Sequence, residues 1–359
     1  MQSKRLTLIN DQPKFSGIGQ YSQDLVKILT SEGYEVTYVS IDCDQGNRQH
    51  LNTVCAADPF KNFRFKFSFY NLSTFNIRAL HSYVGGFVHI TSQYLVPLGI
   101  KNKNVAVTVH DLNKLHIFGV DFITRTFITL KSCLLGKYKL ISAPSHYVKN
   151  DILSHFKTDE ESIYVMYNFI DLTKIDASRF NNSENANNST ILHVGSDMPN
   201  KNINLIYKIL KVLPSSFKLI RVGANSQRNL KYAKDNDLLK RIIFYEGVST
   251  EVLNDLYRTS SVFLYPSKFE GFGRPLLEAM AHGLPVVYRN SSSLPEIAGD
   301  AGLPFDTDDV KEVVELIYKS IDNPENERLR RRSLERSKFF DLKSQRDNIL
   351  KFYELLLEP

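Results

Sequence analysis

The sequence lacks the features that mark membrane-spanning, secreted or disulfide-rich proteins. Its 359 residues contain no run of 18 apolar residues, which argues against a spanning helix. The first ten residues have a hydrophobic part too short for a signal peptide and no small-residue cleavage site. The three cysteines, Cys43, Cys55 and Cys133, lie far apart without metal-binding or redox spacing. We therefore expect a protein of the reducing cytoplasm.

Two phosphate-binding signatures are also missing. No G-x-x-x-x-G-K-[ST] loop is present, and the glycine-rich segment Ser16–Gly19 has only G-x-G, without the third glycine of the dinucleotide fingerprint. The bulk composition is ordinary, with 42% hydrophobic and 23% charged residues. A chain of this length and composition is expected to form about two globular domains.

Acidic residues are scarce in one long stretch. Between Lys61 and Lys139 there are eleven basic residues and only Asp111 and Asp121 in opposition, a net charge of +9 in a chain whose total is +6. Such a field attracts an anionic partner, which would be a phosphorylated acceptor, an acidic lipid surface or nucleic acid. The alternative is that the charges are spread around a solvated face.

Strands and helices are predicted to alternate along the chain. A strand at 5–9, a glycine loop at 15–19, a helix at 20–30 and a strand at 34–40 predict a βαβ unit. Further strands are predicted at 87–90, 105–109, 140–143 and 163–166.

The polar segment 181–190 is interpreted as a linker or surface loop. Beyond it the alternation resumes, with strands predicted at 191–195, 218–223, 241–244, 262–265 and 285–288 and helices at 204–213, 275–282 and 342–357. The fold class is therefore α/β, with two parallel-sheet domains.

Glycines follow three of the predicted strands: Gly17 lies in the loop after the first strand, and Gly195 and Gly223 lie at the ends of two later strands. Ligands bind beyond the carboxyl ends of the strands in open α/β sheets, and glycine lets backbone amides approach a phosphate. Taken singly, each glycine is better explained by an ordinary tight turn.

The most informative segment is 265–287. Pro275 suits the first position of a helix, and Gly271 and Gly273 open the turn before it. Glu270 is expected in the loop and Glu278 in the first helical turn, with both carboxylates facing one cleft. They suit sugar hydroxyls and a ribose diol, while the helix end meets phosphate. The alternative is that Glu270 is solvated and Glu278 only favours the helix dipole.

This segment, with seven residues between Glu270 and Glu278, resembles the E-x7-E signature of retaining family-4 glycosyltransferases of the GT-B fold. Further segments match that family's landmarks in the expected order, and they cover nearly the whole chain: 16–21, 108–112, 144–148, 167–171, 193–202 and 293–302. The resemblance implies two Rossmann-like domains facing across a cleft. The acceptor-side domain would span 1–175 and the nucleotide-sugar domain 186–340, with the helix at 341–359 crossing back onto the first.

The resemblance also implies roles for individual residues. Glu270, His110 and Lys201 would be catalytic: the lysine neutralises the diphosphate, and the histidine faces the reacting sugar. The alternative for His110 is a buried strand-end histidine with a structural role, but its position at a strand exit, followed by Asp111, favours the site interpretation. The donor would be bound by Gly17, Gly195, Ser196, Arg221, Gly223, Val248, Gly271, Phe272, Gly273, Arg274, Leu276 and Glu278. Many members carry arginines where this chain has Asn200 and Ser196, so phosphate binding would rest on Lys201, aided by Arg274.

The implied activity is transfer of a hexose, with retention, from a nucleotide-diphosphate sugar to a glycan or lipid-phosphate-linked acceptor. No metal and no cofactor are expected, because Lys201 and amide donors would stabilise the leaving diphosphate. Two other functions stay open: a GT-B epimerase acting on a sugar nucleotide, and a non-catalytic nucleic-acid-binding protein. No nucleic-acid motif is present, so nucleic acid is not expected as a partner.

Two segments bear on membrane attachment. Phe63–Phe69 alternates phenylalanine with polar residues, which favours a half-buried strand over an aromatic-basic surface. Phe122–Leu135 is flanked by basic residues and is interpreted first as a packed helix. Since many members of the resembled family use lipid-phosphate acceptors, peripheral attachment to an anionic inner membrane face is a further hypothesis.

Overall fold

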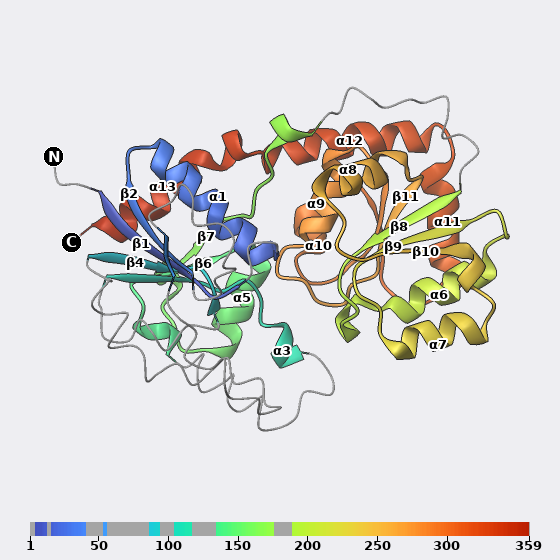
Figure 1. The fold of residues 1–359 in the computed structure, drawn as a ribbon, viewed down its shortest axis with the longest axis horizontal. Helices are drawn as coiled ribbons and strands as arrows, with labels where there is room; N and C mark the ends of the chain where they lie inside the picture. Colours follow the sequence, from blue (N-terminus) through green and yellow to red (C-terminus); the bar gives the residue numbers. More distant parts are fainter. Residues whose placement is uncertain are drawn as a thin grey trace. The chain divides into compact units, whose positions relative to one another are not determined.

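Both halves of the chain alternate buried strands with helices, and each half forms its own unit. The computed structural model describes residues 4–12, 16–40, 53–55, 86–93, 104–116, 134–175 and 189–358. Unit 1 consists of Met1–Asn168 with Arg346–Pro359, and unit 2 consists of Phe169–Gln345 (Figure 1).

Unit 1 is built on a parallel seven-stranded sheet in the order β3-β2-β1-β4-β5-β6-β7. Aliphatic runs are buried along its central strands, as expected for a parallel sheet covered by helices, and all four residues of β5 and of β6 are buried. The strands are β1 (Arg5–Asn10), β2 (Glu35–Ser40), β3 (Thr53–Cys55), β4 (Phe87–Ile90), β5 (Val105–Thr108), β6 (Leu140–Ala143) and β7 (Ile163–Val165).

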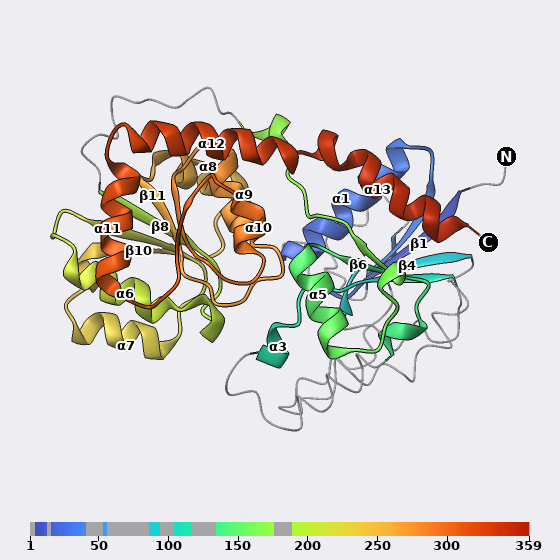
Figure 2. The ribbon, with the colours of Figure 1, turned by 180° about the vertical axis from the view of Figure 1, so that it is seen from behind.

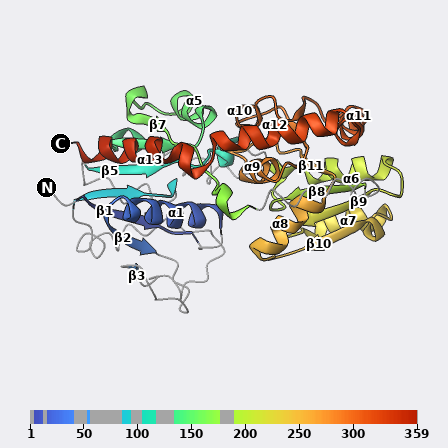
Figure 3. The same cartoon turned by 90° about the horizontal axis from the view of Figure 1, so that it is seen from above.

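Helices cover both faces of this sheet. Helix α1 (Gly17–Ser31) runs along β1 and β2, as Figure 3 shows from above. In Figures 1 and 2, α1 and α13 (Leu342–Leu357) lie above the sheet and α5 (His146–His155) below it. A short helix, α3 (Asn113–His116), follows β5.

Helix α13 joins unit 1 through its apolar face. Ile349, Phe352, Tyr353 and Leu356 are completely buried. The Tyr353 hydroxyl is 2.7 Å from Nδ1 of His89, whose Nε2 is 2.8 Å from the Thr108 hydroxyl. Burial lowers the pKa of His89 to about 3, so the imidazole is neutral and both of its nitrogens hydrogen-bond within the core. The C-terminal helix is thus tied to the centre of this sheet.

Unit 2 is built on a parallel six-stranded sheet in the order β10-β9-β8-β11-β12-β13. Its strands are β8 (Thr190–Val194), β9 (Lys218–Val222), β10 (Ile242–Tyr245), β11 (Val262–Tyr265), β12 (Val286–Arg289) and β13 (Leu303–Phe305). The core includes the fully buried side chains of Ile206, Ile209 and Leu210 from α6 (Ile203–Val212), which recur at helical spacing.

The helices of unit 2 form a layer on each side of its sheet. In Figures 1 and 2, α6 and α7 (Gln227–Asp235) lie below the strands, and α8, α9 and α12 lie above them. These upper helices are α8 (Thr250–Thr259), α9 (Arg274–Ala281) and α12 (Glu325–Phe339); α10 (Leu294–Ala298) packs against α9, and α11 (Val310–Ile321) packs against α6.

Local boundaries differ from the sequence predictions in two places that matter for the site. The predicted glycine loop at 15–19 is largely the first turn of α1, because Ser16 caps the helix by accepting a hydrogen bond from the Gly19 amide at 3.0 Å. Glu278 was predicted in the first turn of its helix, but α9 begins at Arg274, so Glu278 opens the second turn.

Several predictions lie outside the described residues. They are the Phe63–Phe69 strand, nearly all of the Phe122–Leu135 segment, most of the linker at 181–190 and most of the basic stretch between Lys61 and Lys139. Within the described part of the chain, no helix has the length and apolarity that a membrane crossing requires.

Candidate functional site

The topology of unit 2 marks one edge of its sheet as a binding position. The strand order reverses at β8, with β9 and β10 on one side and β11 to β13 on the other. In open α/β sheets, ligands bind outside the carboxyl ends of the strands at such a switch point. The chain leaves β8 toward Gly195 and Lys201, and it leaves β11 toward Glu270. Residues from both exits meet there.

Lys201, Tyr265 and Glu270 form a hydrogen-bonded cluster at this edge. Lys201 Nζ lies 2.5 Å from Glu270 Oε1 and 3.2 Å from the Tyr265 hydroxyl, which donates to the same carboxylate oxygen at 2.8 Å. The Lys201 and Glu270 side chains are only 13% and 11% exposed, so solvent screens the pair weakly. The cluster holds an ammonium group in a fixed position, suited to an anionic ligand.

The backbone around Lys201 is fixed by several contacts. A short 3-10 turn spans Pro199–Lys201, and Asn202 adopts a left-handed conformation at φ 53°. Asn200, in turn, donates from Nδ2 to the carbonyl of Phe269 at 2.9 Å and accepts at its own carbonyl from the Lys268 amide at 2.7 Å. These bonds join the loop after β8 to the loop that carries Glu270. Asn200 therefore has a positioning role here.

The Glu270 loop is held from the other side by two serines. The Glu270 amide donates to the Ser292 hydroxyl at 3.0 Å, and the Ser293 hydroxyl donates to the Glu270 carbonyl at 2.9 Å. Gly273, which precedes α9, has φ 90°, and a Cβ there would lie 2.6 Å from Leu294 Cδ2. The positive φ favours glycine at this turn, and a Cβ there would push the Leu294 side chain of α10 aside. Gly271 and Phe272, both buried, stand between Glu270 and that turn.

Glu278 belongs to a second network. The Tyr257 hydroxyl donates to its Oε2 at 3.0 Å, and Arg274 Nε lies 3.1 Å from its Oε1. Burial, followed by the charge of Glu278, raises the pKa of Tyr257 well above its usual value, so the hydroxyl remains a donor. His282 stacks on Tyr257, with ring centroids 5.2 Å apart. The carboxylate is therefore held in place, and Arg274 is already paired with it.

The two glycines after β8 and β9 are in direct contact. A Cβ on Gly223, which has φ 124°, would lie 2.1 Å from the Gly195 carbonyl oxygen. Arg221, fully buried, donates from Nη1 to the carbonyls of Gly195 and Val222 at 2.6 and 2.5 Å, and from Nη2 to that of Ala224 at 3.2 Å. The Arg221 guanidinium thus links the segments that follow β8 and β9. Its contacts here are structural.

His193, near the end of β8, lies beside Gly195. Its Nδ1 donates to the Leu264 carbonyl at 2.9 Å, while its buried Nε2 has no hydrogen-bond partner. Burial, together with the nearby charge of Arg221, lowers the pKa of His193 well below its usual value. A Cβ on Gly195 would be 3.6 Å both from His193 Nε2 and from the aliphatic carbons of Lys201. The lysine side chain therefore passes beside Gly195 on its way to Glu270.

His110 lies in unit 1, just beyond β5. It is 8% exposed, its Nε2 donates to the Thr91 carbonyl at 2.8 Å, and its ring packs edge-on against Tyr21 at 5.2 Å. Burial lowers its pKa to about 4. The imidazole is neutral near pH 7, and the tautomer set by Thr91 leaves Nδ1 as an acceptor. This suits hydrogen bonding to a hydroxyl better than proton donation.

The other predicted donor-binding residues occupy varied positions. Gly17, the first residue of α1 in unit 1, is exposed. In unit 2, Ser196 is exposed in the loop after β8, Val248 is half-buried in the loop after β10, and Leu276 is fully buried in the first turn of α9. The structure thus brings Gly195, Lys201 and Glu270 together and pairs Arg274 with Glu278.

Sequence reasoning missed the residues that orient these groups. Tyr265 and Tyr257 hydrogen-bond to Glu270 and Glu278, and Ser292 and Ser293 hold the Glu270 loop. One signal was available: Tyr265 ends a predicted buried strand, and a buried tyrosine hydroxyl usually needs a partner. The sequence around Tyr257 offered no such signal, because its hydrogen bond to Glu278 depends on how α8 and α9 lie in the folded unit.

Two family models match the chain. Residues 174–336 match the model described as Glycosyl transferases group 1, and residues 15–174 match the model described as Glycosyltransferase Family 4. Together the two matches extend over most of both units.

Among curated proteins, the chain is similar to O-antigen chain mannosyltransferase RfbU of Salmonella typhimurium, with 30% identity over 225 residues, which are 62% of this chain and 61% of that protein. It is also similar to O-antigen chain mannosyltransferase B of Escherichia coli, with 35% identity over 173 residues, 46% and 45% of the two chains. The matched regions therefore span less than two thirds of each relative.

Among solved structures, sucrose-phosphate synthase from Thermosynechococcus elongatus superposes with a TM-score of 0.84, covering 98% of this chain and 99% of that one. The sequence identity is 18%. At that level the likeness concerns the fold alone.

Proposed function

Since the chain belongs to the group 1 glycosyltransferases and has the GT-B fold, we propose that it is a retaining mannosyltransferase. Its donor would be a nucleoside-diphosphate mannose, and its acceptor a hydroxyl of a growing glycan. Two relatives named as O-antigen chain mannosyltransferases support the choice of sugar and acceptor. The observation that carries the site assignment is the weakly exposed Lys201–Glu270 pair at the switch point of unit 2.

Lys201 is assigned to the donor diphosphate. When the bond between the sugar C1 and the phosphate oxygen breaks, the electron pair stays on that oxygen, and negative charge grows on the leaving group. An ammonium group already fixed by Glu270 and Tyr265 stabilises this charge without reorganising in the transition state. We assign this neutralisation to the lysine and nearby amides, which makes the transfer independent of a metal ion.

Glu270 is assigned to the hydroxyls of the donor sugar. Its Oε1 accepts from both Lys201 and Tyr265, which fixes the carboxylate and lowers its nucleophilicity. This favours a positioning role over covalent attack on C1. The acceptor hydroxyl would then attack C1 from the side that the diphosphate leaves and pass its proton to the departing phosphate oxygen, so that configuration is retained. Glu278, held by Tyr257 and Arg274, is assigned to the ribose.

The proposal is tested first by thermal shift with GDP-, UDP- and ADP-mannose, because a bound donor stabilises the folded state. The stabilising donor is then incubated with a mannose-terminated oligosaccharide, and the anomeric configuration of the product is determined by NMR. Retention and strict dependence on the acceptor are expected. An altered free sugar formed without any acceptor would instead identify an epimerase.

Two substitutions test the site. Glu278→Ala should weaken donor binding, and Glu270→Ala should mainly lower turnover. If both variants keep full activity with the stabilising donor and acceptor, the assignment of these carboxylates is wrong. A matched control is Glu315→Ala on α11, which changes a carboxylate of the same unit away from the switch point.

A further inference from the structure

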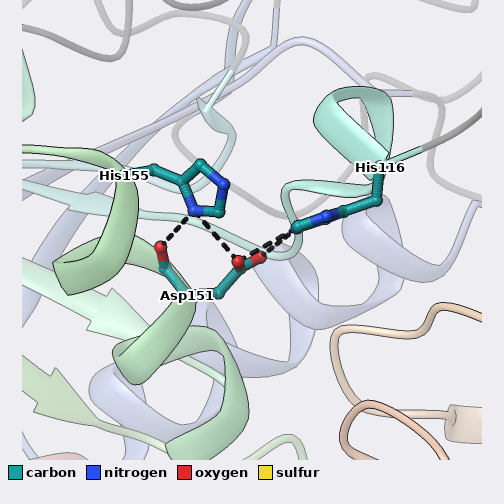
Figure 4. Close-up of side chains that lie close together, drawn as sticks. All are labelled: His116, Asp151 and His155. Carbon is teal, nitrogen blue, oxygen red and sulfur yellow. Dashed lines mark hydrogen bonds and ion pairs between the residues drawn. The ribbon is translucent and has the colours of Figure 1, made fainter.

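Three metal-ligating side chains converge in unit 1, apart from the residues assigned to sugar transfer. Asp151 and His155 lie on α5, and His116 is the last residue of α3 (Figure 4). One ligand atom from each lies within 4.8 Å of the other two. Within the described residues this is the one cluster of three or more histidine, cysteine or acidic side chains close enough to share an ion.

The two separations between the carboxylate and the imidazoles are close to those of a tetrahedral site. His116 Nε2 lies 3.0 Å from both carboxylate oxygens of Asp151, and His155 Nδ1 lies 3.2 Å from Oδ1. Two atoms that each bind zinc at about 2.0–2.1 Å, with tetrahedral angles, are about 3.3 Å apart. The carboxylate is therefore already near the separation from each imidazole that a shared ion requires.

The local sequence explains why these groups meet. Asp151 and His155 are four residues apart on a helix, so both project from one face. His116 reaches them from the segment after β5, and its ring packs edge-on against that of His155 with centroids 5.2 Å apart. Figure 4 shows a ring nitrogen of each histidine turned toward the carboxylate. The short helix α3 and the helix α5 thus supply a three-residue site.

Exposure favours binding over a sealed core interaction. The Asp151 side chain is 7% exposed, while those of His116 and His155 are 22% and 37% exposed. With two partly accessible imidazoles beside a buried carboxylate, an ion can reach the site from solvent and find an anionic ligand there. Two imidazole nitrogens with one carboxylate oxygen suit zinc rather than magnesium or calcium, which prefer oxygen ligands alone.

We propose that His116, Asp151 and His155 form a zinc site with three protein ligands and a fourth position open to water. The ion would join α3 to α5 on the side of unit 1 that carries α5. This inference does not depend on the function proposed above, whose diphosphate site lies in unit 2 and uses Lys201.

The competing explanation is a metal-free network in which Asp151 accepts hydrogen bonds from both histidines. His155 Nδ1 is also 2.9 Å from the Asp151 backbone carbonyl, a contact that a protonated Nδ1 makes without any ion. The two explanations differ in a measurable way. A hydrogen-bonded trio binds no zinc stoichiometrically, whereas a metal site does so with all three side chains contributing.

The test is isothermal titration calorimetry with Zn²⁺ on the full chain, purified without a histidine tag and stripped with a chelator. One ion per chain is expected. His116→Ala and Asp151→Asn should each weaken binding at least about 100-fold, because even changes outside the first shell of ligands cost up to about that much. His146→Ala, an exposed histidine on the same helix and outside the trio, is the control and should bind as the unchanged protein does.

A second measurement covers variants that fold poorly. Zinc at saturating concentration should raise the melting temperature of the unchanged protein and of His146→Ala, but not that of the exposed-site variant His155→Ala. Absence of stoichiometric zinc binding by the unchanged protein overturns the proposal. Binding that survives both His116→Ala and Asp151→Asn overturns it as well.

Discussion

Replacing Lys201 by methionine should show separately what its ion pair with Glu270 contributes to stability and what its ammonium group contributes to activity. The pair is 2.5 Å long, and its side chains are 13% and 11% exposed. Removing one partner of a buried pair costs about 3–5 kcal/mol, because the remaining charge is stranded away from water. Since a tenth of each side chain still meets solvent, we expect the lower end, about 3 kcal/mol. This corresponds to a fall in melting temperature of about 6–12 °C for a domain of this size.

Activity should fall for a different reason. If the ammonium group stabilises the leaving diphosphate, its loss removes one charge donor from the transition state, which typically costs about 100- to 1,000-fold in kcat. Adding Glu270→Gln to Lys201→Met removes the stranded charge while keeping an acceptor for the Tyr265 hydroxyl. The double variant should regain most of the lost stability, to within about 1 kcal/mol of the unchanged protein, but none of the activity.

The assays are urea unfolding at pH 7 and initial rates with saturating donor and acceptor. Lys268→Met is the matched control, because its ion pair with Asp308 is 3.1 Å long but 42% and 44% exposed. It should change stability by at most about 1 kcal/mol and leave the rate unchanged. A double variant as unstable as Lys201→Met would refute the stranded-charge reasoning. Full activity of Lys201→Met would refute the phosphate assignment.

Three further predictions follow from the packing. Burial lowers the pKa of His89 to about 3 and that of His110 to about 4. Below pH 6.5 the unfolded chain therefore takes up a proton that each buried imidazole excludes, and the free energy of unfolding falls by about 1.4 kcal/mol per pH unit for each histidine. His89→Gln should make the decline in the free energy of unfolding from pH 7 to pH 5 about 2 kcal/mol shallower. Gly223→Ala, with its Cβ 2.1 Å from a carbonyl oxygen, should cost about 3 kcal/mol or more by urea unfolding, against about 1–2 for Gly247→Ala, which has open space at φ 64°. Tyr257→Phe should weaken nucleoside-diphosphate binding about 10-fold by calorimetry, while an unchanged affinity would show that its bond to Glu278 is dispensable.

The sequence determined much of the architecture by itself, because the relevant signals are local. Short aliphatic runs separated by glycine and helical periodicity predicted the strands of both sheets except β3 and β13, and the C-terminal helix was predicted with the bounds it has, Leu342–Leu357. The order of motifs around Glu270 and Glu278 identified the family. The exact starts of α1 and α9 were missed, since a capping hydrogen bond at Ser16 and the turn at Gly273 decide them.

Only the tertiary structure decided which side chains share an environment. Lys201 and Glu270 are 69 residues apart, and His116 and Asp151 are 35 apart, so neither pair leaves a trace in local periodicity. Arg221 in a predicted strand gave no sign that it would be buried against the carbonyls of Gly195 and Ala224. Strand order and helix packing set these contacts, because they bring distant segments to one sheet edge and there fix the charge, burial and partners of each group.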